Sequence, residues 1–122
     1  MIGMPGTVRV ENTTKAAPLA DSARLADRYL SRLVGLLNRR HLEPGEGLVL
    51  LPGGAIHMFF MRMAIDVVFA DKEGLVLKTA VNVKPWRLVM APRHTRYTLE
   101  LPIGAVDQTG TAPGDILDIT SS

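Results

Sequence analysis

The sequence contains no cysteine, which excludes disulfide bonds, thiolate metal sites and a cysteine nucleophile. This absence fits a reducing compartment, and we predict a cytoplasmic protein. Serine is rare: the chain has only Ser22, Ser31, Ser121 and Ser122, and no Gly-x-Ser-x-Gly motif. Serine-nucleophile catalysis is therefore close to excluded. The glycines follow neither the Walker nor the dinucleotide-binding pattern, which argues against a phosphate-binding loop.

Long apolar runs are also absent. No run approaches the roughly 18 apolar residues of a membrane-spanning helix. The N-terminus lacks the charged head and apolar region of a secretory signal, so we expect no membrane partner. The three histidines are widely spaced, and a histidine-cluster metal site is not expected. We therefore predict no metal and no cofactor.

The chain has 122 residues, of which 47% are hydrophobic and 21% charged, as is typical of a globular protein. A length in this range favours one domain. We predict an N-terminal tail over residues 1–6 and a single globular domain over residues 7–122.

Positive charge is concentrated in one segment. The formal net charge is only +2, but residues 74–99 hold five cations and no acidic residue. These cations are Lys78, Lys84, Arg87, Arg93 and Arg96. A nucleic-acid accessory role through residues 78–96 is therefore one alternative. The low net charge and the few aromatic residues argue against it, so nucleic acid is an improbable partner.

The most apolar stretch runs from Ala55 to Ala70 and carries only three ionisable side chains. Both of its period-2 faces are apolar, which predicts one strand, or two strands with a bend near Ala64, covered on both sides. Asp71–Gly74 follows as a four-residue loop, and Leu75–Val83 alternates cleanly. We predict that this segment pairs with Ile65–Ala70 as an antiparallel hairpin.

The other segments are mostly short strands. Strands are predicted over Thr7–Glu11, Leu48–Leu51, Tyr97–Leu101 and Asp115–Thr120, with a loop over Leu88–His94 and a turn region over Thr109–Gly114. Helix propensity favours one helix over Asp21–Asn38. The alternative is a strand over Pro18–Leu25 and a helix over Arg28–Leu37. Together the pattern predicts a mainly β, antiparallel sandwich or barrel with one short α-helix.

Eight motifs occur in the order of a known family. They are Gly35-Leu36-Leu37, Gly45-Glu46-Gly47-Leu48, Ile56-His57-Met58-Phe59-Phe60-Met61-Arg62, Ile65-Asp66-Val67-Val68-Phe69, Asp71-Lys72-Glu73-Gly74, Pro85-Trp86-Arg87, Leu99-Glu100-Leu101-Pro102-Ile103-Gly104 and Gly114-Asp115. Over residues 8 to 120 the chain resembles the bacterial and archaeal "domain of unknown function 192" family. Ala64 stands where that family usually has proline, so the bend there is less rigidly imposed. The resemblance implies a compact, mostly β, sandwich-like domain with a short helix and favours the strand over Pro18–Leu25. It implies no activity.

Three side chains could support catalysis. His57 lies on an otherwise apolar face and could be a structural histidine, a general base or a metal ligand. Asp66 requires a partner within an apolar strand, such as Arg62 or a loop amide. Glu100 is expected to face outward, because its flanking leucines face the core. If Asp66 and Glu100 converge, His57, Asp66 and Glu100 would form the site of a small hydrolase.

Trp86 and Arg87 directly follow a predicted strand. Trp86 could fill the core or stack on a ligand beside a guanidinium group. We predict a non-enzymatic binding domain whose site includes His57, Asp66, Trp86, Arg87 and Glu100 and whose partner is a small molecule or a protein. The hydrolase and the nucleic-acid accessory protein remain the alternatives.

Overall fold

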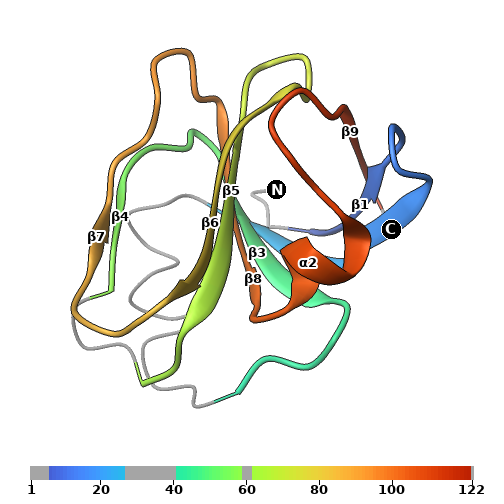
Figure 1. The fold of residues 1–122 in the computed structure, drawn as a ribbon. Coiled ribbons are helices and arrows are strands. Elements are labelled where there is room, and N and C mark those ends of the chain that lie inside the picture. The colour runs from blue at the N-terminus through green and yellow to red at the C-terminus, as the bar shows by residue number, and fades with distance from the viewer. Residues whose placement is uncertain (1–5, 27–40, 59–61, 122) are drawn as a thin grey trace.

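The computed structural model describes residues 6–26, 41–58 and 62–121. It contains nine strands and one helix within these residues (Figure 1). The strands are β1 (Thr7–Asn12), β2 (Ala17–Ala26), β3 (Glu46–Leu50), β4 (Ile56–His57), β5 (Ile65–Ala70), β6 (Val76–Val83), β7 (Leu88–Val89), β8 (Tyr97–Pro102) and β9 (Leu117–Ser121). The helix is α2 (Ala105–Thr109). The mainly β class predicted from the sequence is confirmed.

Seven strands form one sheet in the order β6-β5-β8-β3-β2-β1-β9, and β4 pairs with β7 as a separate ribbon. Strands β2 and β3 are parallel, whereas every other adjacent pair is antiparallel. The predicted antiparallel pairing therefore holds for every neighbouring pair except β2 and β3, and the sheet is mixed. The connection over residues 27–45 is long enough for the crossover that a parallel pair requires, but its length alone does not specify that topology.

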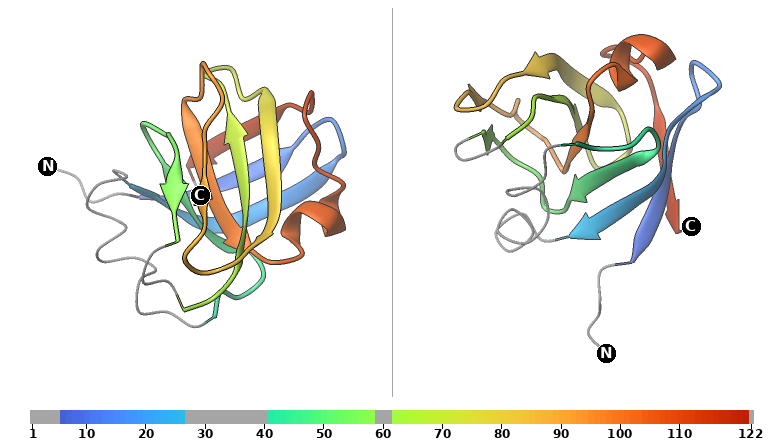
Figure 2. Two further views of the ribbon diagram at one scale, coloured as in Figure 1. Left: turned by 60° about the vertical axis from the view of Figure 1, so that its left-hand side comes forward. Right: turned by 90° about the horizontal axis from the view of Figure 1, so that it is seen from below.

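The large sheet curls so that its edge strands β6 and β9 meet at one end (Figure 2). Leu75 forms an antiparallel bridge with Ile116, and the Leu117 N–H donates to the Gly74 carbonyl oxygen at 2.8 Å. Gly74 has φ 86°, a conformation that glycine adopts readily. The sheet edges are therefore partly protected by each other.

Both faces of the curled sheet are packed. One apolar cluster lies against α2 and includes Val68, Leu99 and Leu101. The other lies between the sheet and the β4–β7 ribbon and includes Val67 and Phe69. Alternate residues of β5 enter the two clusters, and all six residues of this strand are buried. The prediction that the central apolar stretch is covered on both sides is confirmed for β5.

The hairpin predicted across Asp71–Gly74 is also confirmed. Strand β5 pairs antiparallel with β6, with Val68 opposite Thr79. The Asp71 carboxylate accepts the N–H groups of Glu73 and Leu75, both at 2.9 Å, within the loop. The alternation of both strands and the short loop thus predicted the correct pairing.

Helix α2 was not predicted from the sequence, and two predicted segments differ from the structure. The strand reading of Pro18–Leu25 is correct, so the longer helix beginning at Asp21 was wrong; helix propensity is a weak prior that strand pairing overrides here. The helix predicted over Arg28–Leu37 lies outside the described residues. The loop predicted over Leu88–His94 contains β7, whose two residues are too few for an alternation to be visible.

A polar cluster joins the β1–β2 turn to the loop before β9. The fully buried Asn12 amide donates to Thr111 Oγ1 at 2.9 Å and to Asp115 Oδ2 at 3.0 Å. Lys15 Nζ donates to Asp115 Oδ2 at 2.8 Å. The Asn12 hydrogen bond and the Lys15 contact hold the pKa of Asp115 below its ordinary value of 3.8. These hydrogen bonds connect the turn between β1 and β2 to the loop that precedes β9.

Candidate functional site

Asp66 is a buried structural acceptor. Its side chain is 1% exposed. Oδ1 accepts the Asn82 N–H at 2.9 Å, and Oδ2 accepts the N–H groups of Gly104 at 3.1 Å and Val106 at 3.0 Å. These bonds hold a left-handed residue of β6, Asn82 at φ 51°, and the first turn of α2. The loop-amide alternative for Asp66 is therefore correct.

Glu100 is fully buried, contrary to the expectation that it faces outward. On β8 it lies between Leu48 of β3 and Val67 of β5, both of which belong to the cluster beneath the β4–β7 ribbon. Its flanking leucines do face a core, as predicted, but the second layer covers the opposite face as well. The outward orientation was predicted for a sheet with only one covered face, whereas both faces of this sheet are covered.

Asp66 and Glu100 consequently lie on opposite faces of the sheet. Asp66 lies two residues before Val68 on β5, so the two side chains lie on the same face of the sheet. Asp66 also accepts the Val106 N–H, and both Val68 and Val106 belong to the apolar cluster against α2. Glu100 belongs to the ribbon-side layer. The sheet therefore separates the two carboxylates, and the structure does not form the carboxylate pair that the hydrolase hypothesis requires.

His57 lies in β4, where its backbone is opposite Leu88 of β7. The position of its side chain lies outside what the structure describes. The roles considered for His57, as structural histidine, general base or metal ligand, therefore stay predictions.

Trp86 occupies an unusual turn position. The Arg87 N–H donates to the Lys84 carbonyl oxygen at 3.3 Å, which closes a four-residue turn with Pro85 second and Trp86 third. Trp86 has φ 73°, and proline followed by a positive-φ residue is the signature of a type II turn, in which the third position favours glycine. For a bulky side chain this conformation is rare and strained.

Two hydrogen bonds hold this turn against the β4 segment. The Trp86 N–H donates to the Met58 carbonyl oxygen at 2.8 Å, and the Met58 N–H donates to the Arg87 carbonyl oxygen at 2.7 Å. Met58 is itself fully buried. The strained turn is thus fixed to the core, while the Trp86 side chain is 59% exposed. Of the two alternatives, the exposed position excludes Trp86 as a core residue.

Two further large apolar side chains are exposed on the same segment. Leu88 and Met90 are each 60% exposed, whereas the intervening Val89 packs against the cluster beneath the ribbon. This alternation follows the period of an extended chain. Trp86, Leu88 and Met90, together with the neighbouring exposed Lys84 and Arg87, are called the β7 face below.

Two cations of the basic segment, Lys84 and Arg87, belong to this face. Lys84, Arg87, Arg93 and Arg96 are all exposed. Lys78 donates from Nζ to the Met90 carbonyl oxygen at 3.0 Å and lies 5.8 Å from the centre of the Phe69 ring. The charge asymmetry of the sequence is therefore largely presented to solvent, next to an exposed apolar surface.

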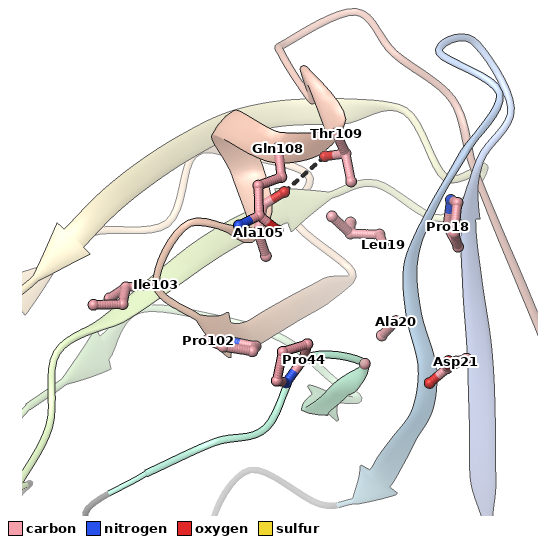
Figure 3. Close-up of a pocket in the computed structure, with 11 residues that line it drawn as sticks. Pro18, Leu19, Ala20, Asp21, Pro44, Pro102, Ile103, Ala105, Gln108 and Thr109 are labelled. Carbon is pink, nitrogen blue, oxygen red and sulfur yellow. Dashed lines mark hydrogen bonds between the residues drawn. The ribbon is translucent and has the colours of Figure 1, made fainter.

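A hollow of about 270 Å³ lies elsewhere, beside α2 (Figure 3). Its walls come from β2, the loop before β3, the end of β8, and α2, and they include Pro18, Pro44 and Pro102. This hollow was not predicted from the sequence. Four segments distant in sequence form it, and no local pattern connects them.

The described part of the chain contains no group of three or more His, Cys, Asp or Glu side chains arranged to bind a metal ion. Among the same residues, no helix is both long enough and apolar enough to cross a bilayer.

The fold and these surfaces define a small, mainly β domain without a recognisable catalytic centre in its described residues. The chain belongs to the DUF192 family, described as "Uncharacterized ACR", whose model matches residues 10–119. It is 33% identical to the UPF0127 protein PF1050 of Pyrococcus furiosus over 113 residues, which cover 88% of this chain and 94% of that protein. It is also 33% identical to a UPF0127 protein of Thermococcus sibiricus, over 88% of this chain and 71% of the relative. The family resemblance inferred from the motifs is confirmed.

Two crystal structures share this fold. A protein of unknown function from Novosphingobium aromaticivorans superimposes with a TM-score of 0.77, over 92% of this chain and 83% of that one, at 24% identity. A protein described as a putative transcription regulator, from Sinorhizobium meliloti, gives a TM-score of 0.76 over 95% and 97% of the two chains, also at 24% identity. At this identity the two structures establish the fold alone.

Proposed function

We propose that the chain is a non-enzymatic binding domain and that its β7 face binds an acidic, partly apolar segment of another protein. One observation carries the proposal: a tryptophan occupies a positive-φ turn position that favours glycine, and its ring is 59% exposed. A left-handed conformation costs about 1–2 kcal/mol for a non-glycine residue. Strain of this kind, maintained by bonds to a buried residue, often marks a functional position.

The energetics favour a partner that carries both apolar groups and negative charge. Full burial of a leucine or methionine contributes about 1.5–3 kcal/mol, so covering the exposed part of Leu88 or Met90 contributes roughly 1–2 kcal/mol each. Association costs about 4–15 kcal/mol in lost freedom. The three apolar side chains alone would barely offset that cost. Attraction to the exposed Lys84 and Arg87 speeds the association of an acidic partner and selects it over a neutral or basic one.

The other candidate functions receive less support. The hydrolase alternative loses its carboxylate pair, because Asp66 and Glu100 lie on opposite faces of the sheet. The nucleic-acid alternative retains the exposed basic segment, and the Sinorhizobium meliloti protein of the same fold is described as a putative transcription regulator. However, base stacking requires aromatic platforms, and Trp86 is the only large aromatic on the β7 face.

To test this proposal, the free energy of unfolding and the affinity for a peptide are measured for Trp86→Gly. Relief of the turn strain offsets much of the packing lost with a half-covered ring, so the free energy of unfolding should change by about 1 kcal/mol or less. Removal of a core tryptophan would instead cost about 3–5 kcal/mol. The binding probe is a fluorescein-labelled acidic peptide with spaced leucine residues, followed by anisotropy. Trp86→Gly and Leu88→Ser should each weaken its binding about tenfold, equivalent to 1.4 kcal/mol.

Two comparisons make the result specific. Ile103→Ser removes an apolar side chain of similar exposure, 57%, from outside the β7 face and should leave peptide binding unchanged. Arg87→Glu should abolish binding of the acidic peptide and permit binding of the same peptide with Lys in place of its acidic residues. Equal peptide binding by the wild type, Leu88→Ser and Arg87→Glu would refute the proposal. Salt-sensitive binding of single-stranded DNA, weakened by Arg87→Ala, would favour the nucleic-acid alternative instead.

A further inference from the structure

The hollow beside α2 has rigid, largely apolar walls. Pro18, Pro44 and Pro102 line it from three different segments of the chain, with Pro44 next to Pro102 and Pro18 apart from them (Figure 3), and proline has a fixed φ and no backbone N–H. The neighbouring Leu19 and Ala20 are almost completely buried. A surface of this kind is preformed and offers few hydrogen-bond donors to a ligand.

Among the described residues that line the hollow, Asp21 is the only charged one. Its backbone N–H donates to the Gly45 carbonyl oxygen at 3.1 Å, and its carboxylate lies against the Gly45 backbone. Gly45 has φ 89°, and a Cβ atom there would overlap the Asp21 carboxylate. In Figure 3 the Asp21 oxygen points toward Pro44. No hydrogen bond or ion pair joins this carboxylate to any other side chain in the described part of the chain.

The hollow continues into a second one of about 300 Å³. The two share Pro44, Pro102 and Ile103, and Ile103 is 57% exposed. Met63, Leu42 and His41 line the second hollow, and His41 Nε2 lies 2.9 Å from Glu43 Oε2. An apolar chain that begins at Asp21 can therefore extend past Ile103 along a largely apolar surface.

We propose that this groove binds an alkylammonium group, with the cation at Asp21 and the aliphatic chain against the proline walls and Ile103. The Asp21 carboxylate has no hydrogen-bond or ion-pair partner among the described side chains, and a carboxylate attracts a cation and repels an anion. The apolar walls select a ligand with an aliphatic body over a bare inorganic cation. The ligand source is either a free aliphatic amine or a lysine side chain of a peptide, since both present the same group. This proposal concerns a site separate from the β7 face and is independent of it.

The test is a titration of ¹⁵N-labelled protein with hexylammonium, followed by amide chemical shifts. Saturable shifts should appear at Asp21, Gly45, Ala105 and Gln108. Hexanol, which has the same chain without the charge, should bind at least tenfold more weakly, and hexanoate should not bind. Asp21→Asn keeps the side-chain shape and should weaken hexylammonium binding at least tenfold. Leu88→Ser on the β7 face should leave it unchanged.

A lysine-containing peptide and its Nε-acetylated form distinguish the two sources. Stronger binding of the unmodified peptide than of hexylammonium would identify a peptide lysine, and the reverse would identify a free amine. Shifts that are equal for hexylammonium and hexanol, or that persist in Asp21→Asn, would overturn the proposal by showing an apolar surface without charge selection. The absence of saturable shifts would overturn it as well. None of these results depends on peptide binding at the β7 face.

Discussion

Replacement of Asp66 by asparagine tests whether this carboxylate is structural. Asparagine has the same shape but only one acceptor oxygen, and its NH₂ group can only donate. If that oxygen takes the place of Oδ2, it retains the N–H groups of Gly104 and Val106. The NH₂ group then faces the Asn82 N–H, which Oδ1 accepts at 2.9 Å in the wild type. Two donors would oppose each other in a buried site.

The expected loss follows from these bonds. A hydrogen bond to a charged group contributes about 1.5–3 kcal/mol, and a buried unsatisfied donor costs about 1–3 kcal/mol. Because such contributions overlap, Asp66→Asn should lower the free energy of unfolding by about 2–4 kcal/mol. That loss is a large part of the 5–15 kcal/mol typical of a native domain. Asp66→Ala, which removes all three acceptor contacts, should lower it further.

The assay is urea denaturation, with the midpoint and slope determined for each variant. Amide exchange should accelerate specifically at Asn82, or at Val106 if the asparagine adopts the opposite rotamer. Asp118→Asn provides the control, since Asp118 is exposed on β9 and should shift stability by less than about 0.5 kcal/mol. A loss of similarly small size for Asp66→Asn would refute the structural assignment and make Asp66 available again as a functional carboxylate.

Two other predictions concern the contacts that Asp115 and Leu117 make with distant parts of the chain. Gly74→Ala should destabilise the fold more than Gly114→Ala: both positions have positive φ, but a Cβ at Gly74 would overlap the Leu117 carbonyl oxygen, whereas nothing lies within 4 Å of one at Gly114. Equal melting temperatures for the two variants would contradict this. Because the pKa of Asp115 is lowered in the folded state, its stabilising contribution is present above the ordinary value of 3.8 and is lost as pH falls from there through the lower folded value. Acid titrations of stability should therefore show a smaller decline in that pH window for Asp115→Asn than for the wild type.

Local features of the sequence predicted the parts of the fold that depend on local physics. The β5–β6 hairpin was predicted because two alternating segments flank a short polar loop. The parallel pairing of β2 with β3 was not, since the strands are joined through residues 27–45 and no local signal fixes their direction. Helix α2 was missed for a related reason. Its first amides bind Asp66, which precedes Gly104 by 38 positions, so no capping side chain is visible nearby in the sequence.

The candidate site shows the same difference between features set by local sequence and features set by tertiary contacts. Trp86 and Arg87 could be selected from the sequence because a tryptophan between proline and arginine after a strand is conspicuous, and both are exposed. The burial of Glu100 could not be foreseen, because it depends on the β4–β7 ribbon covering the second face of the sheet. The groove at Asp21 had no sequence signal at all. A carboxylate near three prolines becomes a distinct surface only when β2, β8 and α2 meet.

The environment of a carboxylate decides its role more than its presence in an apolar strand does. Both Asp66 and Glu100 drew attention because acids in such strands require partners. Asp66 finds three of them in backbone amides, so to act as a base it would have to release the first turn of α2 and the bulge at Asn82. Asp21 sits on a strand of ordinary polarity and was considered only as the first residue of the longer helix, yet its carboxylate has no such bonds within the described residues. Of these three acids, Asp21 is therefore the one assigned to a ligand cation in our proposal, because no hydrogen bond described for its carboxylate has to break.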